Sequence, residues 1–240
     1  MKLRIMALIV GVLATEVTTA RAATLTHVII LVRDMQTGRH AFAAAGFNLG
    51  PTNPISRGLL HAVIPFRDGT FLELIAALPH SSYAKDVGKY VKHGDVLSSA
   101  GFEVANVYAE AAALRARGFR VDPLERSPHW IDLSFSEPAG MLEPFFLYQY
   151  RGDYGTRALR KYARLAESQP YGAIGIRGID VAVEPGQKAE ATYAAAGLRG
   201  VTAVERGAGD ATITVVSLAT SDPRRKGTMM LIDRCRIRYE

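Results

Sequence analysis

The stretch AATLTHVIILVRDMQTGRHAFAAAGFNLGP, residues 22–51, decides the fold. Its alternating apolar run over residues 25–32 predicts a strand, and the Ala- and Phe-containing segment 35–45 predicts an amphipathic helix. Two further apolar runs follow, joined by Arg67-Asp68-Gly69, and predict a hairpin with a three-residue loop. With a short extended piece before the hairpin, the order of elements is β-α-β-β-β.

The same order recurs twice further along the chain. At the end of the predicted helix, Phe119 takes the place of Phe47 in the second copy and Leu198 does so in the third. A unit of roughly 55 residues cannot bury both faces of its sheet alone, so the units are expected to pair. We therefore expect an α+β fold, in which repeated βαβββ modules form a cupped mixed β-sheet or barrel with the helices outside.

The chain divides into four predicted parts. Residues 1–22 are typical of a signal peptide, because Lys2 and Arg4 precede an apolar run too short to span a bilayer and Ala20-Arg21-Ala22 fits a cleavage site. Residues 23–150 then hold two modules, residues 151–171 a polar linker and residues 172–240 the third module. The sequence thus predicts an exported protein, periplasmic or secreted, with no stable membrane anchor after cleavage.

Charge and cysteine content narrow the function classes. The formal net charge of +6 is mild, and the basic residues are scattered apart from one short cluster at 222–227, which does not favour a nucleic-acid site. Cys235 is the single cysteine, so an intramolecular disulfide is impossible. A bound metal would depend on His and carboxylate ligands.

Alternation along the strands assigns side chains to the inner face of the cup. If Val28, Ile30 and Val32 pack on the helix, the intervening residues face the cavity. These residues are Leu25, His27, Ile29 and Leu31 of the first strand and Phe71, Glu73 and Ile75 of the last. His61 lies opposite Ile75 in the predicted hairpin and shares this face.

His27, His61 and Glu73 form the candidate site of the first module. Two histidines and one carboxylate are a ligand set for a divalent metal whose identity stays open. Glu73 or His61 can alternatively transfer protons. An isolated buried carboxylate is costly, so Glu73 needs a cation, a metal or a hydrogen-bond donor nearby.

The second module offers hydroxyl and aromatic groups instead. Ser99 falls at the position of His27, and matching the two hairpins places Tyr148 at the position of Glu73. The cavity side also receives Glu103, Trp130, Asp132 and Tyr150, and all six are predicted to bind the substrate. The third module has Gly178 and Leu231 at the two positions, with Asp180 and Asp233 nearby, so it completes the architecture or an interface, as in a homodimer.

These stretches resemble the glyoxalase-like domain of the vicinal oxygen chelate superfamily. LTHVIILVRDMQTGRHAFAAAGF and DGTFLELIA carry the resemblance, which covers residues 24–150 well and 172–240 more loosely. It implies paired modules, a cupped barrel and often a divalent metal held from the first and last strands, where His27 and Glu73 stand. The chain departs from the family at Ser99 and Tyr148. It also has Gln169 where relatives carry a histidine before the third unit, which argues against a lactoylglutathione lyase.

Three functions stay open. The first is a metal-dependent lyase, isomerase or dioxygenase acting on a small oxygenated substrate. The second is a binding protein that sequesters a small molecule without chemistry, and here the aromatic residues would matter more than His27. The third is an exported structural protein whose third unit pairs between chains.

Overall fold

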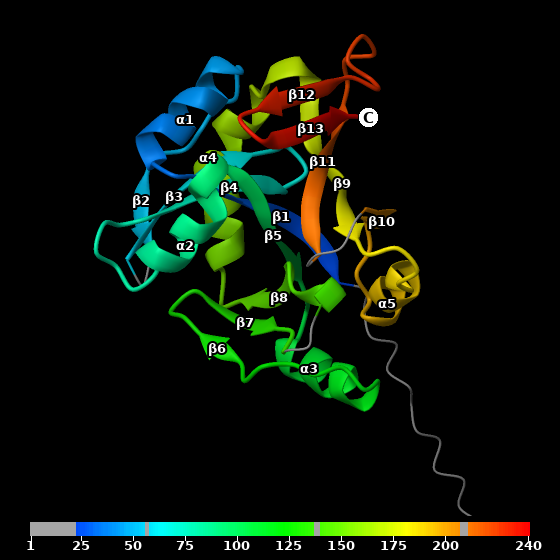
Figure 1. Ribbon diagram of the computed structural model, residues 1–240. Coiled ribbons are helices and arrows are strands. Elements are labelled where there is room, and N and C mark those ends of the chain that lie inside the picture. The colour runs from blue at the N-terminus through cyan, green and yellow to red at the C-terminus, as the bar shows by residue number, and fades with distance from the viewer. Residues whose placement is uncertain (1–22, 56–57, 137–139, 207–210) are drawn as a thin grey trace, which may run out of the picture.

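The computed structural model describes residues 23–55, 58–136, 140–206 and 211–240 (Figure 1). The predicted signal peptide, residues 1–22, lies outside these ranges. Within them, no helix is both long and apolar enough to cross a membrane.

The first sheet of the described residues joins the two predicted modules. Its strand order is β2-β3-β4-β1-β5-β8-β7-β6. The strands are β1 (Thr24–Leu31), β2 (Asn53–Ile55), β3 (Leu59–Pro65), β4 (Phe71–Ala77), β5 (Val96–Glu103), β6 (Glu125–Arg126), β7 (Trp130–Ser134) and β8 (Phe145–Tyr150). β1 runs parallel to β4, β5 runs parallel to β8, and β1 and β5 meet antiparallel at the centre. The predicted pairing of βαβββ modules into a cupped sheet is confirmed.

Two helices cover the outer face of this sheet near its two ends. α1 (Met35–Ala44) packs against β3 and β4, and α3 (Val107–Ala116) packs against β7 and β8. Each begins at a capping residue, because Asp34 accepts a hydrogen bond from the Thr37 N–H at 2.8 Å and Asn106 accepts from the N–H groups of the first turn. Their apolar faces join the strand residues in one core.

The inner face of the sheet is bordered by two further helices. α2 (Ala84–Tyr90) and the 3-10 turn η1 (Val91–His93) pack beside β4, and α4 (Tyr154–Glu167) crosses β3. Val87 and Val91 join Leu31 and Ile75 in a small apolar cluster separate from the main core. Residues 79–95 therefore do more than connect the modules, since they close one end of the cup.

A second sheet contains the C-terminal part of the chain, in the order β10-β9-β11-β13-β12. Its elements are β9 (Ala173–Val183), α5 (Ala189–Ala195), β10 (Val201–Glu205), β11 (Thr212–Thr220), β12 (Met229–Ile232) and β13 (Cys235–Tyr239). The last strand of the predicted third module is divided, because a tight turn at Asp233, with a φ of 50°, makes it a hairpin of β12 and β13. The third unit thus has one strand more than the predicted βαβββ module.

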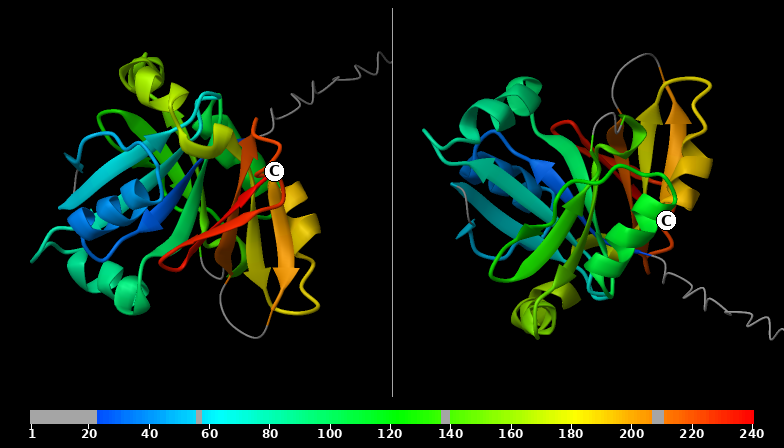
Figure 2. Two further views of the ribbon diagram at one scale, coloured as in Figure 1. Left: turned by 90° about the horizontal axis from the view of Figure 1, so that it is seen from above. Right: turned by 90° about the horizontal axis from the view of Figure 1, so that it is seen from below.

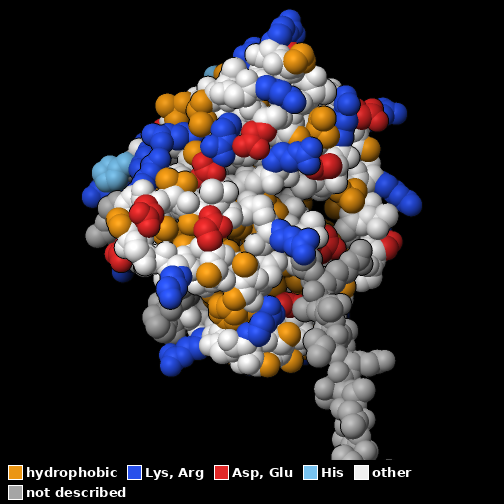
Figure 3. All heavy atoms as spheres, turned by 90° about the vertical axis from the view of Figure 1, so that its right-hand side faces the viewer, with side chains coloured by type: hydrophobic (Ala, Val, Ile, Leu, Met, Phe, Trp, Pro, Cys, Tyr) orange, Lys and Arg blue, Asp and Glu red, His pale blue; other side chains and the backbone are white. Residues whose placement is uncertain are grey.

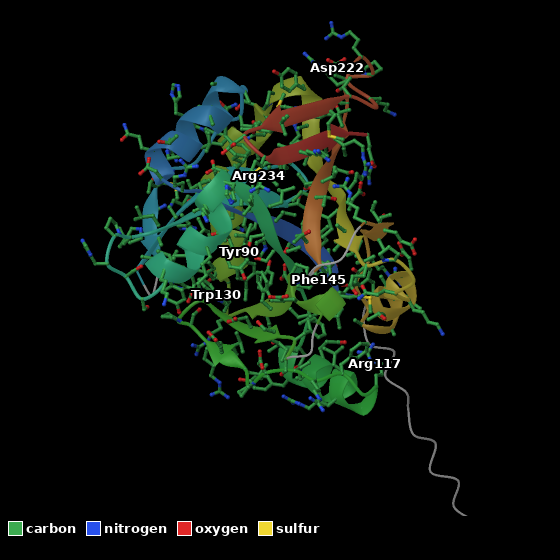
Figure 4. The ribbon with its side chains drawn as sticks, in the orientation of Figure 1. Tyr90, Arg117, Trp130, Phe145, Asp222 and Arg234 are labelled. Carbon is green, nitrogen blue, oxygen red and sulfur yellow. The ribbon has the colours of Figure 1, made fainter. Side chains whose placement is uncertain are left out.

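The second sheet packs on the outer face of the first, where α1 and α3 leave β1 and β5 uncovered. β9 contacts β1 and β11 contacts β5, as the two views of Figure 2 show. Val28, Phe102, Ile179 and Val216 belong to one continuous core. Arg117 of α3 reaches across to α5, where it donates to the Ala195 carbonyl at 2.7 Å (Figure 4). The face of the cup opposite these contacts is left for a ligand.

The β12–β13 turn also contacts the segment that follows η1. The Asp233 carboxylate accepts a hydrogen bond from the Asp95 N–H at 2.7 Å, and the Asp95 carboxylate accepts one from the Arg33 N–H at 3.0 Å. A side chain at Gly94 would overlap the Asp233 carboxylate. The C-terminal hairpin therefore anchors the segment that closes one end of the cup.

The face of the molecule that carries the second sheet has no single sign of charge. Figure 3 shows its basic side chains interspersed with acidic and apolar ones. This face offers no continuous basic surface of the kind that binds nucleic acid.

Candidate functional site

Strand register places the three candidate residues of the first module on one face of the cup. His27 pairs with Phe71, and Ile29 pairs with Glu73 on the neighbouring strand. His61 lies opposite Ile75, as predicted. The alternation therefore predicted this part of the inner face correctly.

Leu25 is the exception. The β1–β5 register shifts between Leu25 and His27, which is a bulge. The bulge turns Leu25 into the main core, so its predicted place on the cavity side is wrong. It also brings the Thr26 hydroxyl to the inner face, beside His27.

His61 and Glu73 form a hydrogen-bonded pair on the floor of the cup. His61 Nδ1 lies 2.6 Å from Glu73 Oε1, and the two side chains are 19% and 15% exposed. An ionised carboxylate only accepts hydrogen bonds, so Nδ1–H donates and the second carboxylate oxygen is left for other partners. The donor that the sequence required for Glu73 is His61.

His27 lies deeper and is enclosed by rings. It stacks on Phe71 with ring centroids 4.6 Å apart and meets the edges of Phe146 and Tyr148 at 5.4 and 5.3 Å. On its other side the imidazole lies so close to Gly101 that a Cβ there would overlap it. Burial lowers the pKa of His27 to about 4, although the nearby Glu73 charge opposes the shift. His27 is neutral at physiological pH.

The side chains present do not fit the predicted metal site. Within the described ranges, no three His, Cys, Asp or Glu side chains come together closely enough to hold an ion. His27 Nδ1 contacts the Thr26 hydroxyl at 3.1 Å, and His61 Nδ1 is used by Glu73. The two-histidine, one-carboxylate set therefore separates into a pair and a buried third member.

The second module presents neutral groups at the corresponding positions. Ser99 pairs with Ile29 while Gly101 pairs with His27, so Ser99 is the counterpart of His27, as predicted. Gly101 in turn pairs with Phe146, which makes Phe146 the counterpart of Glu73. The predicted equivalence of Tyr148 and Glu73 is wrong by two residues, because the match between the two hairpin sequences is displaced by two positions from the strand register.

The remaining predicted lining residues share the inner face. Trp130 pairs with Tyr150, and Tyr148 lies between Asp132 and Glu103 on its neighbouring strands. Figure 4 shows Trp130 on β7. Burial, helped by the Glu103 and Glu73 charges and opposed by the neighbouring Tyr148 hydroxyl, raises the pKa of Tyr150 to about 12. Tyr150 thus lies within electrostatic reach of the carboxylate on the opposite half of the cup.

Comparison with known proteins agrees with this geometry. The family model described as "glyoxalase-like domain" matches residues 25–197 of the chain. The chain belongs to the glyoxalase-like domain family. Its fold is that of the vicinal oxygen chelate superfamily.

Two solved structures are similar to this glyoxalase-like chain at low sequence identity. A hypothetical protein from Staphylococcus aureus is 11% identical, with 92% of this chain and 99% of that chain covered and a TM-score of 0.68. A methylmalonyl-CoA epimerase from Mycobacterium tuberculosis is 19% identical over 59% of this chain and 97% of its own, with a TM-score of 0.47. A search of curated proteins gives no match.

The described residues of the third unit, 172–206 and 211–240, hold no comparable open pair. Asp180 receives two hydrogen bonds from Arg238 at 2.8 and 3.0 Å, and Arg238 also donates to Ser217. Asp233 anchors the Gly94 segment, and Leu231 is exposed. These carboxylates are occupied by structural contacts.

Two hollows of the glyoxalase-like chain lie away from the cup. One of about 520 Å³ lies beside α2, between Arg33 and Lys92, and one of about 430 Å³ lies between Arg117 and Tyr193. Neither is lined by His61 or Glu73. We place the site in the cup because the chemically active groups converge there and keep part of their surface exposed.

Sequence reasoning missed three contributors to the site of the glyoxalase-like chain. Thr26 was hidden by the bulge, Phe146 by the slipped alignment of the hairpins, and Gly101 because its role depends on a ring from another strand. The one available signal was a glycine inside a predicted strand, which often marks the close approach of another group.

Proposed function

We propose that this glyoxalase-like chain transfers a proton to or from a small, neutral, oxygenated organic molecule bound in the cup, with Glu73 as the base. The observation that carries the proposal is the Glu73 carboxylate, held at 2.6 Å by His61 and partly exposed on the inner face. A positioned carboxylate on an apolar, aromatic surface is a suitable general base. His61 orients this carboxylate through their hydrogen bond.

The proposed step is abstraction of a proton next to a carbonyl group. Glu73 takes the proton from carbon, the C–H electron pair forms a carbon–carbon double bond, and the carbonyl oxygen becomes an enolate. Return of the proton to the same or another carbon gives an isomerisation, and loss of a group from the enolate gives an elimination. The Glu73 and Glu103 charges near Tyr150 favour a neutral substrate over an anionic one.

Hydrogen exchange tests the proposal. In D₂O, the wild-type protein is expected to catalyse exchange of the methylene protons of hydroxyacetone or of 2-hydroxy-1-phenylethanone for deuterium. Proton NMR measures the rate at which the methylene signal is lost. Loss of a general base lowers such rates about 10² to 10⁴-fold, which is the expected effect of Glu73→Gln. Glu205→Gln, an exposed glutamate on β10, is the matched control and should exchange at the wild-type rate. Equal rates in wild type and Glu73→Gln would contradict the proposal.

The proposed step assigns no role to a divalent metal, because no three His, Cys, Asp or Glu side chains of the described residues converge and Ser99 and Phe146 stand at the corresponding positions of the second module. Elemental analysis of protein purified without chelator tests this point. A stoichiometric metal that is lost in Glu73→Gln would restore the metal-dependent version of the site.

Binding without chemistry is the second candidate. It is favoured by the half-buried rings on and beside the inner face, which are Phe71, Phe146, Trp130, Tyr150 and Tyr154. Rings of this kind hold flat organic molecules. A thermal shift with an aromatic compound, together with no exchange of either ketone, would favour this function.

Export and chain pairing belong to the same proposal. Residues 1–22 would direct the chain out of the cytoplasm, and N-terminal sequencing of secreted or periplasmic protein should then begin at Ala23. Light scattering tests whether two chains pair.

A further inference from the structure

The hollow beside α2 has the size of a ligand site. It lies where the ends of β1 and β4 meet α2 and η1 (Figure 1), and its volume is about 520 Å³. Ligand sites in proteins typically measure roughly 300 to 1,000 Å³. This space, the α2 hollow, is separate from the cup, because neither His61 nor Glu73 lines it.

The α2 hollow is lined by two cations and by no carboxylate. Arg33 and Lys92 are exposed, and within the described ranges neither side chain takes part in an ion pair. Carboxylates of the same segments are engaged: Asp95 accepts a hydrogen bond from the Arg33 N–H at 3.0 Å, and Asp86 of α2 pairs with Lys89 at 2.8 Å. The hollow therefore presents positive charge to a ligand.

The wall between the two cations is apolar. It consists of Val87 and Val91, one helical turn apart, together with Ala77 and Pro79 at the end of β4. An apolar chain that covers such a wall is removed from water, which is favourable in proportion to the area buried. A ligand with one anionic end and one apolar end matches this combination of charge and surface.

Gly88 keeps the hollow open. It lies inside α2 and lines the hollow, and a Cβ at this position would meet no atom within 4 Å. Glycine is the least favourable residue in a helix interior apart from proline, so α2 loses helix stability here. No close packing among the described residues requires a glycine at this position. Its effect is to leave a side chain out of the wall of the hollow.

We propose that the α2 hollow binds a small organic monocarboxylate, with the carboxylate between Arg33 and Lys92 and a short apolar chain against Val87 and Val91. The charge preference is opposite to that of the cup, where Glu73 and the other carboxylates of the inner face disfavour an anion. This second site holds whether or not Glu73 performs chemistry.

The bound carboxylate would contact a wall that the cup shares. Val87 and Val91 line the hollow and also join Leu31 and Ile75 in the small apolar cluster that closes one end of the cup. A ligand on these two valines should reduce local opening of α2 and η1. Hydrogen exchange followed by mass spectrometry should therefore show slower amide exchange over residues 84–93 when hexanoate is added.

Hexanoate, 1-hexanol and acetate are the matched probes, because 1-hexanol keeps the chain without the charge and acetate keeps the charge without the chain. Ligand-observed NMR titration should show the tightest binding for hexanoate. Loss of one ion pair at an exposed site corresponds to an affinity change of up to about fivefold, which is expected for Arg33→Gln and for Lys92→Gln. Lys85→Gln is the matched control, because Lys85 is an exposed cation of α2 that does not line the hollow.

Gly88→Leu tests the location of the site by filling it. The added side chain enters open space, so circular dichroism should show a folded protein, while hexanoate binding and the slower exchange over residues 84–93 should be lost. Glu73→Gln should bind hexanoate as the wild type does, since the base of the cup takes no part in this site.

The results separate this inference from the proposed function. Equal affinity for hexanoate and 1-hexanol, or hexanoate binding that survives in Gly88→Leu, overturns the inference even if Glu73-dependent exchange of the ketones is seen. Binding that is weakened by Arg33→Gln and Lys92→Gln, kept by Lys85→Gln and lost in Gly88→Leu supports it even if neither ketone exchanges.

Discussion

The two halves of the cup share one backbone plan and differ in chemistry. Where the first half has His27 and Glu73, the second has Ser99 and Phe146 at the same register positions. The first half holds the ionisable pair, and the second holds the packed rings of Phe146, Tyr148 and Tyr150. The duplicated module thus allows one half to specialise in proton transfer and the other in holding the ligand.

The largest expected effect comes from substituting Glu73 and Phe146, which occupy equivalent register positions in the two halves. Glu73→Gln should lower kcat for hydrogen exchange by about 10² to 10⁴-fold, since it removes the base. Phe146→Leu should instead raise KM with little change in kcat, because it removes ring contacts made equally in the ground and transition states. Steady-state kinetics with 2-hydroxy-1-phenylethanone measure both. A fall in kcat for Phe146→Leu as large as that for Glu73→Gln would erase the division between the halves.

The next effect is the pH dependence of stability caused by His27. Its pKa is about 4 in the folded chain against 6.5 as the ordinary value, so below pH 6.5 the unfolded chain binds a proton that the folded chain excludes. The stabilisation is complete above pH 6.5, falls as the pH drops, and is lost near pH 4. The free energy of unfolding should decrease by about 3 kcal/mol over this window.

Urea denaturation of wild type and His27→Leu at several pH values isolates this contribution from those of the other histidines. The difference in free energy of unfolding between the two proteins should change steadily from pH 6.5 to 4. A constant difference would place His27 in contact with water and refute the enclosure described above.

The smallest effects concern two glycines. Gly101→Ala places a methyl group against the His27 ring, and overpacking of this kind costs roughly 1–3 kcal/mol. Gly88→Ala in α2 meets open space and should stabilise the fold by up to about 1 kcal/mol through helix propensity. Thermal unfolding measures the stability of each variant relative to the wild type. If both variants are equally stable, the close approach of His27 to β5 is wrong.

The sequence was sufficient for the faces of the strands and insufficient for their irregularities. Alternation placed Glu73 and His61 together, because both faces of a regular strand follow from a period of two. The predicted face of Leu25 was wrong because a bulge adds a residue to the strand, and no local pattern in an apolar run indicates a bulge. The match of Tyr148 to Glu73 was wrong because similarity between two short apolar stretches does not fix the strand register.

The third unit shows a different limit. Its strands were predicted from local apolar runs, but Asp233 in a left-handed conformation was needed to divide the last one. Its place on the outer face between α1 and α3 depends on contacts distant in sequence, which composition and periodicity do not encode. The division of the chain at residues 151–171 stays a prediction.

The contact of Asp233 with the Gly94 segment has a consequence for biosynthesis. Asp233 in the turn of the β12–β13 hairpin is synthesised 138 residues after Asp95, the residue that it holds. A nascent chain that has exposed both modules but not this hairpin would have a cup with one unanchored wall. Ligand binding during synthesis should therefore begin only once the hairpin has left the ribosome.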